Sequence, residues 1–230
     1  MMLEELRKQV LEANLELVRR GLVLYTFGNA SGISRADGLV AIKPSGVPYE
    51  GMRPEDLVIT DLDGRIVEGN LRPSSDLATH LVLYRAFAGI GGVVHTHSRY
   101  ATSWAQARRP IPCLGTTHAD YFRGPVPVTR AMSPAEIAEG YEANTGELIA
   151  RHFSGGDGLE VPAVLVAGHG PFAWGPSAAE AAHNGVILEY VAEMAYYSVT
   201  LAGVPKQLDP AHLDKHFLRK HGASAYYGQK

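Results

Sequence analysis

Two histidines at strand spacing constrain this chain more than any other feature of its sequence. His95 and His97 follow the apolar run at residues 91–94 directly. In a β-strand, residues i and i+2 point to the same face of the sheet, so the two imidazoles would point the same way, as two ligands of one metal ion must. The pattern therefore predicts a strand that ends in a pair of convergent imidazoles.

A third histidine is placed to join this pair. His169 follows a second apolar run, residues 163–166, and lies between Gly168 and Gly170, which leave the backbone free to turn. A lone histidine at a strand end more often packs at the edge of the core. The strand pair together with the glycine turn favours a metal site instead, and three histidines with an open fourth position indicate a catalytic centre.

Length and charge limit the class of protein. A chain of 230 residues can form one α/β domain with a sizeable core, and no Pro- or Ser-rich linker divides residues 1–230. The formal net charge is -3 and the basic residues are scattered, which argues against a nucleic-acid partner. One short basic cluster is interpreted as the solvated face of a C-terminal helix, with an anion as the alternative partner: Lys215, Arg219, Lys220 and His221.

Cysteine usage and the N-terminal segment bear on the compartment. Cys113 is the only cysteine, so it forms no disulfide within the chain, and we interpret it as an ordinary buried residue rather than a zinc ligand. Residues 1–20 carry charges throughout, and no apolar run approaches the length of a membrane span. We therefore expect a soluble, cytoplasmic protein that has no membrane partner.

Helical spacing and capping residues predict several helices. An N-terminal helix ends near Gly21, and another begins at residues 74–76 and carries apolar side chains inward up to Phe87. Two S-x-x-E capping boxes, at Ser133 and Ser177, predict two further helix starts, and the second of these helices runs to about Ala202. The apolar side of the first helix carries Leu3, Leu6, Val10, Ala13 and Leu17.

Turn pairs between short β-type segments predict hairpins in the first third of the chain. Residues 37–38 (DG) precede the segment 39–42, and residues 63–64 (DG) separate the segments 57–59 and 65–67. Hairpins imply antiparallel pairing, whereas the later strands alternate with helices. We therefore predict an α/β fold, a single domain with a central, mostly antiparallel sheet flanked by helices.

Three segments together predict a phosphate pocket. Residues 28–32 (GNASG) are interpreted as a small-residue loop whose backbone N–H groups approach a ligand, residues 43–46 (KPSG) add a cation and a hydroxyl, and residues 74–75 (SS) add hydroxyls at a helix N-terminus. Each of these three segments, taken alone, is a common turn or helix cap. Neither a Walker A motif nor G-x-G-x-x-G is present, so a nucleotide is not indicated. The candidate contacts are Gly28, Asn29, Lys43, Ser45, Gly46, Ser74 and Ser75.

Two carboxylates and a pair of tyrosines are further candidates. Asp76 heads the helix before the histidine strand, where it acts at the metal or serves as an N-terminal charge favoured by the helix dipole. Asp120 lies in a polar stretch and is a candidate acid or base. Tyr226 and Tyr227 lie close to the C-terminal end, where chains fray unless something holds them. Packing on a neighbouring subunit and packing elsewhere are left as equal alternatives for this pair.

Taken in order, these motifs resemble the class II aldolase/epimerase family over almost the whole chain. The segment HTHS at 95–98 is shared across that family, whereas THADY at 117–121 and the ending HFLRKHG at 216–222 with AYYGQ at 225–229 are more specific to its epimerases. The remaining matching segments are TFGN at 26–29, IKPSGV at 42–47, PSSD at 73–76 and GHGPFAWG at 168–175.

This resemblance implies the contents of the site. It implies a zinc-type divalent metal, Zn²⁺ or alternatively Mn²⁺, held by His95, His97 and His169, with Asp76 beside or on it. It also implies that the three segments named above contact a phosphate.

The resemblance further implies an acid/base pair and an oligomer. Asp120 and Tyr227 would form the pair, and His216 would lie near Tyr227. Tyr227 and His216 would come from an adjacent subunit of a cyclic homotetramer, so the tail of each chain would complete a neighbouring site.

The activity that the resemblance implies is epimerisation at C4 of a phosphorylated pentulose, L-ribulose 5-phosphate to D-xylulose 5-phosphate, by retro-aldol cleavage and re-formation of one bond. Two alternatives stay open: another pentulose phosphate such as L-xylulose 5-phosphate, and a sugar-phosphate aldolase that releases its fragments. Such aldolases carry glutamate in place of Asp76 and lack the counterpart of Asp120. A non-catalytic domain of this fold would lose metal ligands, and all three histidines are present here.

Overall fold

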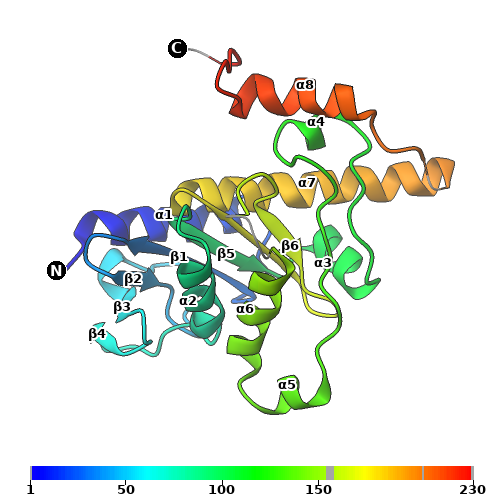
Figure 1. The fold of residues 1–230 in the computed structure, drawn as a ribbon. Helices are drawn as coiled ribbons and strands as arrows, with labels where there is room; N and C mark the ends of the chain where they lie inside the picture. The colour runs from blue at the N-terminus through cyan, green and yellow to red at the C-terminus, as the bar shows by residue number, and fades with distance from the viewer. Residues whose placement is uncertain (1, 154–157, 204, 229–230) are drawn as a thin grey trace.

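A sheet of seven strands forms the centre of the chain in a computed structural model, which describes residues 2–153, 158–203 and 205–228 (Figure 1). Its order is β4-β3-β2-β1-β5-β7-β6, and every neighbouring pair is antiparallel. The predicted fold class is therefore confirmed. The strands are β1 (Gly28–Ser34), β2 (Leu39–Ile42), β3 (Val58–Asp61), β4 (Ile66–Glu68), β5 (Gly92–Thr96), β6 (Ala163–Leu165) and β7 (Pro171–Gly175).

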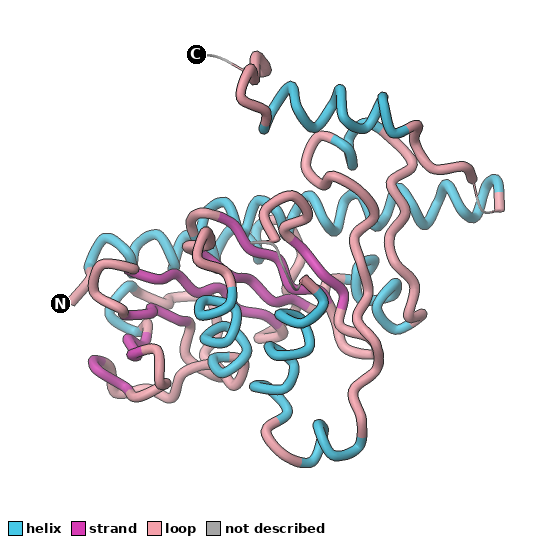
Figure 2. The backbone as a smooth tube through the Cα atoms, in the orientation of Figure 1, coloured by secondary structure: helices cyan, strands magenta, loops and turns pink. Residues whose placement is uncertain are grey.

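Helices cover both faces of this sheet, so the chain has two apolar cores (Figure 2). One core packs α1 (Glu4–Arg19) and α7 (Ala178–Ala202) against one face, and the other packs α2 (Leu77–Ala86) and α6 (Tyr141–His152) against the opposite face. Consecutive strand residues alternate between the cores, as pleating requires. The other helices are η1 (Pro54–Asp56), α3 (Arg99–Gln106), α4 (Thr116–Ala119), α5 (Pro134–Ala138) and α8 (Pro210–His221).

The predicted helices are confirmed, but at Ser177 only half of the predicted capping box forms within the described residues, since its side chain accepts a hydrogen bond from the Glu180 amide and no return bond is present. The apolar side of α1 is buried at Val10, Ala13 and Leu17. At the start of α5, Ser133 accepts a hydrogen bond from the Glu136 amide and the Glu136 carboxylate accepts one from the Ser133 amide, which is the predicted capping box.

One local prediction is wrong: residues 28–32 form most of strand β1 rather than a ligand-binding loop. The backbone of β1 pairs with β2 and β5, so most of its N–H groups are used inside the sheet. The small residues serve close packing instead. A Cβ on Gly32 would lie 2.8 Å from Val10 of α1, and a Cβ on Gly28 would lie 3.0 Å from the carbonyl oxygen of His95.

The C-terminal helix α8 lies outside the two layers, alongside α4 and beyond α7 (Figure 1).

Cys113, just before α4, is buried as predicted, and burial raises the pKa of its thiol to about 11. None of the helices in the described residues is long and apolar enough to cross a membrane.

Candidate metal centre

The three predicted histidines converge at one end of β5. One nitrogen of each ring lies within 4.8 Å of the others, among His95, His97 and His169. The Nε2 atoms of His95 and His97 are 3.1 Å apart. His95 is the fourth residue of β5 and His97 follows its last residue, so strand alternation places both rings on one face as the sequence predicted.

The hydrogen bonding of His95 fits a metal ligand. Its Nδ1 lies 2.9 Å from the carbonyl oxygen of Pro171, which can only accept, so Nδ1 carries the proton and the Nε2 lone pair faces the other histidines. Burial lowers the pKa of His95 to about 3, which keeps the ring neutral at neutral pH. The ring also stacks on Phe172, its cross-strand neighbour in β7, with centroids 4.2 Å apart. The donor set therefore fits a divalent ion such as zinc.

A tight hairpin turn between β6 and β7 presents His169. Gly168 has φ = 76°, a left-handed conformation that favours glycine, and the amide of Val166 donates to the carbonyl oxygen of Gly170 across the turn. A Cβ on Gly170 would lie 2.9 Å from the carbonyl oxygen of Thr96. Both glycines are thus needed to bring His169 against the end of β5.

Asp76 lies beside the three histidines and not among their converging nitrogens. It is the N-cap of α2, and its Oδ2 accepts a hydrogen bond of 2.6 Å from the Asn29 side-chain amide. Burial alone would raise the pKa of the carboxyl, but attraction to the imidazoles of His95 and His80 and the Asn29 hydrogen bond outweigh burial, so the pKa is lowered. The structure thus places an ionised carboxylate at the edge of the centre.

Two loops that the sequence assigned to a phosphate lie side by side. The Ser45 amide donates to the carbonyl oxygen of Arg72, and the Ser74 amide donates to that of Lys43. The ammonium of Lys43 donates to the carbonyl oxygens of Pro44 and Val47, at 3.1 and 2.6 Å, which leaves one of its three N–H donors for a ligand. Burial lowers the pKa of Lys43 to about 8.

These loops and the histidines share one pocket of about 400 Å³. Every predicted phosphate contact lines it, so the metal and phosphate candidates belong to a single cavity. Asn29 also contributes a buried Oδ1 that has no hydrogen-bond partner among the described residues. The predicted residues that line the pocket are Gly28, Asn29, Lys43, Ser45, Gly46, Ser74, Ser75, Asp76, His95, His97 and His169.

Asp120 lies in a separate cluster that α8 and α4 build. Its carboxylate accepts hydrogen bonds from Arg219 at 2.8 and 2.9 Å and lies 3.0 Å from Nδ1 of His216. Burial acts to raise the pKa of this carboxyl, but the hydrogen bonds from Arg219 and His216 lower it further than burial raises it. The interpretation of the basic cluster on α8 as a solvated face is therefore wrong for Arg219 and Lys220, because the anion that they face is Asp120 of the same chain.

Tyr227 belongs to the same cluster. Its amide donates to the carbonyl oxygen of Arg219, and its ring lies over the cations of Arg219 and Lys220, at 4.8 and 4.5 Å. The described tail thus folds back on its own helix, although the ring stays exposed. Tyr227 therefore has contacts within its own chain that can hold it in place.

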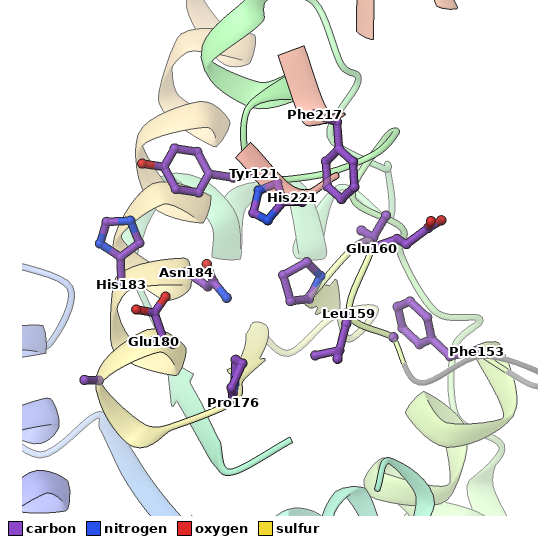
Figure 3. Close-up of a pocket in the computed structure, with 15 residues that line it drawn as sticks. Tyr121, Phe153, Leu159, Glu160, Pro176, Glu180, His183, Asn184, Phe217 and His221 are labelled. Carbon is purple, nitrogen blue, oxygen red and sulfur yellow. The ribbon is translucent and has the colours of Figure 1, made fainter. Parts of the chain in front are cut away.

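The cluster around Asp120 borders a different cavity from that of the three histidines. A cavity of about 1120 Å³ lies between α7, the end of α8 and residues 158–162, and Tyr121 and His221 line it (Figure 3). Tyr121 follows Asp120 in sequence, and Nε2 of His221 bonds the carbonyl oxygen of Asp120. Within one chain, Asp120, His216 and Tyr227 do not line the pocket of the three histidines.

Sequence reasoning missed five residues that line the metal pocket: Thr26, Phe27, Pro44, Tyr141 and Glu142. Phe27 stacks on His97 with ring centroids 6.2 Å apart, and the phenol of Tyr141 lies 3.2 Å from Nδ1 of His169. Phe27 lies in the TFGN segment that matches the family, so the sequence held a signal that could have placed it in the site. Tyr141 is 28 positions from His169 and lies in none of the matching segments, so the sequence held no signal for it.

Comparison with known families agrees with this geometry. The sequence model described as the class II aldolase and adducin N-terminal domain matches residues 8–196. This chain belongs to that family. The match contains all three histidines and Asp120, and it ends before α8.

Individual relatives extend the likeness over the rest of the chain. A protein of Salmonella paratyphi C named L-ribulose-5-phosphate 4-epimerase UlaF is 52% identical over 228 residues, which cover 99% of this chain and 100% of the relative. A solved structure named L-fuculose 1-phosphate aldolase has a TM-score of 0.77 at 27% identity, covering 92% of this chain and 94% of that one. L-fuculose-1-phosphate aldolase from Thermus thermophilus has a TM-score of 0.69 at 26% identity, covering 89% of this chain and 100% of that one.

Proposed function

We propose that this chain is an L-ribulose-5-phosphate 4-epimerase, which interconverts L-ribulose 5-phosphate and D-xylulose 5-phosphate. The observation that carries the proposal is the convergence of His95, His97 and His169 in the pocket that the phosphate-binding candidates line. The full-length relative at 52% identity supports the epimerase over the aldolases, which are only 26–27% identical. An aldolase would release the fragments that an epimerase rejoins.

The three histidines would hold a divalent ion, with Zn²⁺ first and Mn²⁺ as the alternative, and Asp76 would stand beside it. A metal ion bound there supplies Lewis-acid stabilisation of negative charge on substrate oxygens, an effect of several kcal/mol. The protein's part is to keep the ligand rings neutral and oriented. The Pro171 carbonyl does this for His95, and the Asn29 amide orients the Asp76 carboxylate.

The phosphate would lie against the two paired loops. Hydroxyls of Ser45, Ser74 and Ser75 and the ammonium of Lys43 are donors suited to phosphate oxygens. With the phosphate anchored there, the rest of the pentulose would extend toward the histidines. This anchor keeps the phosphorylated fragment bound after cleavage, which epimerisation requires.

Cleavage of the C3–C4 bond explains how C4 inverts. C4 is not adjacent to the C2 carbonyl, so enolisation at C3 cannot exchange its configuration. Removing the proton from the C4 hydroxyl breaks the C3–C4 bond and leaves glycolaldehyde phosphate and a three-carbon enediolate. The aldehyde then turns about its anchored end, and the bond re-forms on its other face as a proton returns to the C4 oxygen. Two proton-transfer groups are needed, one for each face, and we assign them to Asp120 and Tyr227.

We further propose that the acid/base groups act across a subunit boundary. They do not line the metal pocket of their own chain, yet they are held together by Arg219. The resemblance places only Tyr227 and His216 on an adjacent subunit, but within one chain His216 contacts Asp120 and Tyr227 contacts Arg219, which bonds Asp120. We therefore propose that a cyclic homotetramer would bring the whole cluster of one chain over the metal pocket of the next. Because Asp120 bonds both His216 and Arg219 within one chain, these residues would reach the neighbouring pocket together.

Lys43→Met is expected to raise KM for the pentulose phosphate about 10- to 100-fold, because a charge-assisted hydrogen bond contributes about 1.5–3 kcal/mol. The protonated ammonium attracts the phosphate, and burial lowers its pKa to about 8, so KM of the unaltered enzyme should rise as the pH passes above 8. The Lys43→Met enzyme should lose this rise. Steady-state kinetics between pH 7 and about 9 measure both effects.

Lys8→Met is the matched control for that experiment, because Lys8 is an exposed lysine of α1 that pairs with Glu4. It should leave KM and its pH dependence unchanged. If Lys43→Met also leaves both kinetic constants unchanged, the phosphate binds elsewhere.

A further inference from the structure

We propose that Tyr141 is a positioning residue for His169 and sets the affinity of the metal centre. Its phenol oxygen lies 3.2 Å from Nδ1 of His169, and its side chain lines the metal pocket. The inference rests on the proposed metal site and adds to it the first residue of α6.

His169 needs an outside partner more than His95 does. The ring of His95 is buried, hydrogen-bonded to the Pro171 carbonyl and stacked on Phe172. His169 is half-buried and lies on a turn between two glycines. Among the described residues, the phenol of Tyr141 is the one hydrogen-bond partner of its ring. Without that phenol, the side chain of His169 would be free to change rotamer.

The same hydrogen bond is compatible with the tautomer that a metal ligand needs. When Nδ1 of His169 donates its proton to the phenol oxygen, Nε2 carries the lone pair and is the nitrogen left for a metal ion. The Pro171 carbonyl has this role for His95, so two of the three ligands have a defined outer partner. Such partners of metal-bound histidines typically change metal affinity 10- to 100-fold when they are removed.

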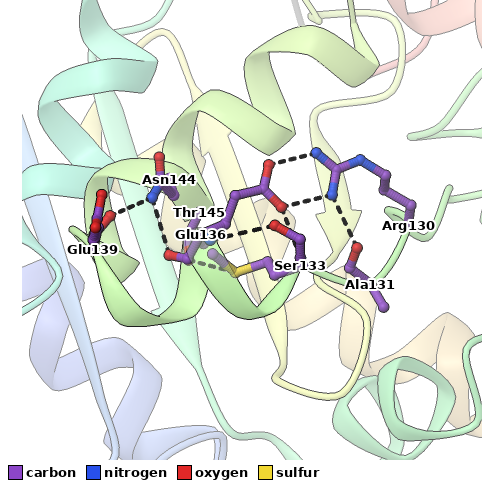
Figure 4. Close-up of polar contacts among 8 residues, drawn as sticks. Arg130, Ala131, Ser133, Glu136, Glu139, Asn144 and Thr145 are labelled. Carbon is purple, nitrogen blue, oxygen red and sulfur yellow. Dashed lines mark hydrogen bonds and ion pairs between the residues drawn. The ribbon is translucent and has the colours of Figure 1, made fainter.

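A polar network around α5 reaches the first turn of α6, the helix that Tyr141 begins (Figure 4). Glu136 accepts hydrogen bonds from the Arg130 guanidinium at 2.6 and 2.8 Å and closes the capping box with Ser133. The Asn144 side-chain amide donates to the carbonyl oxygens of Glu136 and Glu139, at 3.0 and 2.5 Å. These bonds tie the first turn of α6, which Tyr141 begins, to the end of α5.

Tyr141→Phe tests the inference, because it removes one oxygen atom and keeps the ring. We expect its dissociation constants for Zn²⁺ and Co²⁺, measured by chelator competition, to rise 10- to 100-fold relative to the unaltered protein. The visible absorption bands of bound Co²⁺ should also shift, because the ligand geometry changes. Tyr100→Phe is the control, since its phenol bonds that of Tyr197 and does not line the pocket. It should leave both readouts unchanged.

Asn144→Ala is the second variant, and it decides the question if Tyr141→Phe does not fold. It loosens the turn that carries Tyr141 without touching the pocket, so it should raise the same dissociation constants by a smaller factor. Unchanged metal affinity in the folded Tyr141→Phe protein, or in Asn144→Ala if that protein alone folds, overturns the inference. Failure of the unaltered protein to bind Zn²⁺ or Co²⁺ overturns the proposed function instead.

Discussion

The His97→Asn protein is expected to keep its fold and to lose both its bound metal and on the order of 10³-fold or more in kcat. Metal-ion catalysis supplies several kcal/mol, and each 1.36 kcal/mol corresponds to about tenfold in rate. His97 lies exposed at the end of β5, so its replacement disturbs neither core. Metal content by elemental analysis, circular dichroism and kcat are measured on the same preparation.

His152→Asn is the control for this variant, because His152 is an exposed histidine at the end of α6 outside the pocket. It should bind metal and turn over as the unaltered enzyme does. Chelation of the unaltered enzyme should reproduce the His97→Asn phenotype, and added Zn²⁺ or Mn²⁺ should reverse it. A metal-free His97→Asn preparation with full turnover would contradict the role given to the three histidines.

Asp120→Asn and Tyr227→Phe are each expected to lower kcat by about 10²- to 10⁴-fold, the usual range for a lost acid or base, with little change in metal content. Neither residue lines the metal pocket of its own chain. Mixing variants therefore tests whether the cluster acts on a neighbouring chain. The informative mixture combines His97→Asn chains, which keep the cluster, with Asp120→Asn chains, which keep the metal pocket.

If these chains are unfolded and reassembled together, some sites will pair an intact pocket with an intact cluster from the next chain. Random assembly of equal amounts into a cyclic tetramer makes about a quarter of the sites complete, so about a quarter of the unaltered activity should return. Recovery no greater than the sum of the two variants, despite proven mixed tetramers, would mean that each chain completes its own site.

A second mixture gives the matched control. Asp120 and Tyr227 both contact Arg219 of their own chain, so in the proposed assembly one chain would supply both residues to a site. Mixing Asp120→Asn with Tyr227→Phe should therefore restore no activity. Recovery in this mixture would show that the two residues reach one site from different chains.

The convergence of the three histidines was predictable from the sequence because its signals are local. Strand spacing placed His95 and His97 on one face, and a glycine turn presented His169, so each position follows from a few neighbouring residues. The antiparallel sheet was also predictable, because turn pairs and strand lengths are local signals.

The failures concern contacts between distant segments. Residues 28–32 have the composition of a loop, and only the packing of α1 and β5 against them explains why glycine occupies a strand there. Arg219 bonds Asp120 across 99 positions of the chain, so the sequence alone could not distinguish a solvated basic helix face from one that forms an ion pair. Tyr141 of α6 reaches His169 on the hairpin turn across 28 positions of the chain, and no spacing rule links them.

Incubation of the purified, zinc-loaded protein with L-ribulose 5-phosphate, followed by ¹³C NMR of the products, tests the central claim most directly. We predict that D-xylulose 5-phosphate accumulates to equilibrium, that L-xylulose 5-phosphate does not form, and that neither dihydroxyacetone nor glycolaldehyde phosphate is released. Accumulation of those two fragments would make the protein an aldolase. An unchanged substrate, in a preparation with a full complement of metal, would contradict the proposed activity altogether.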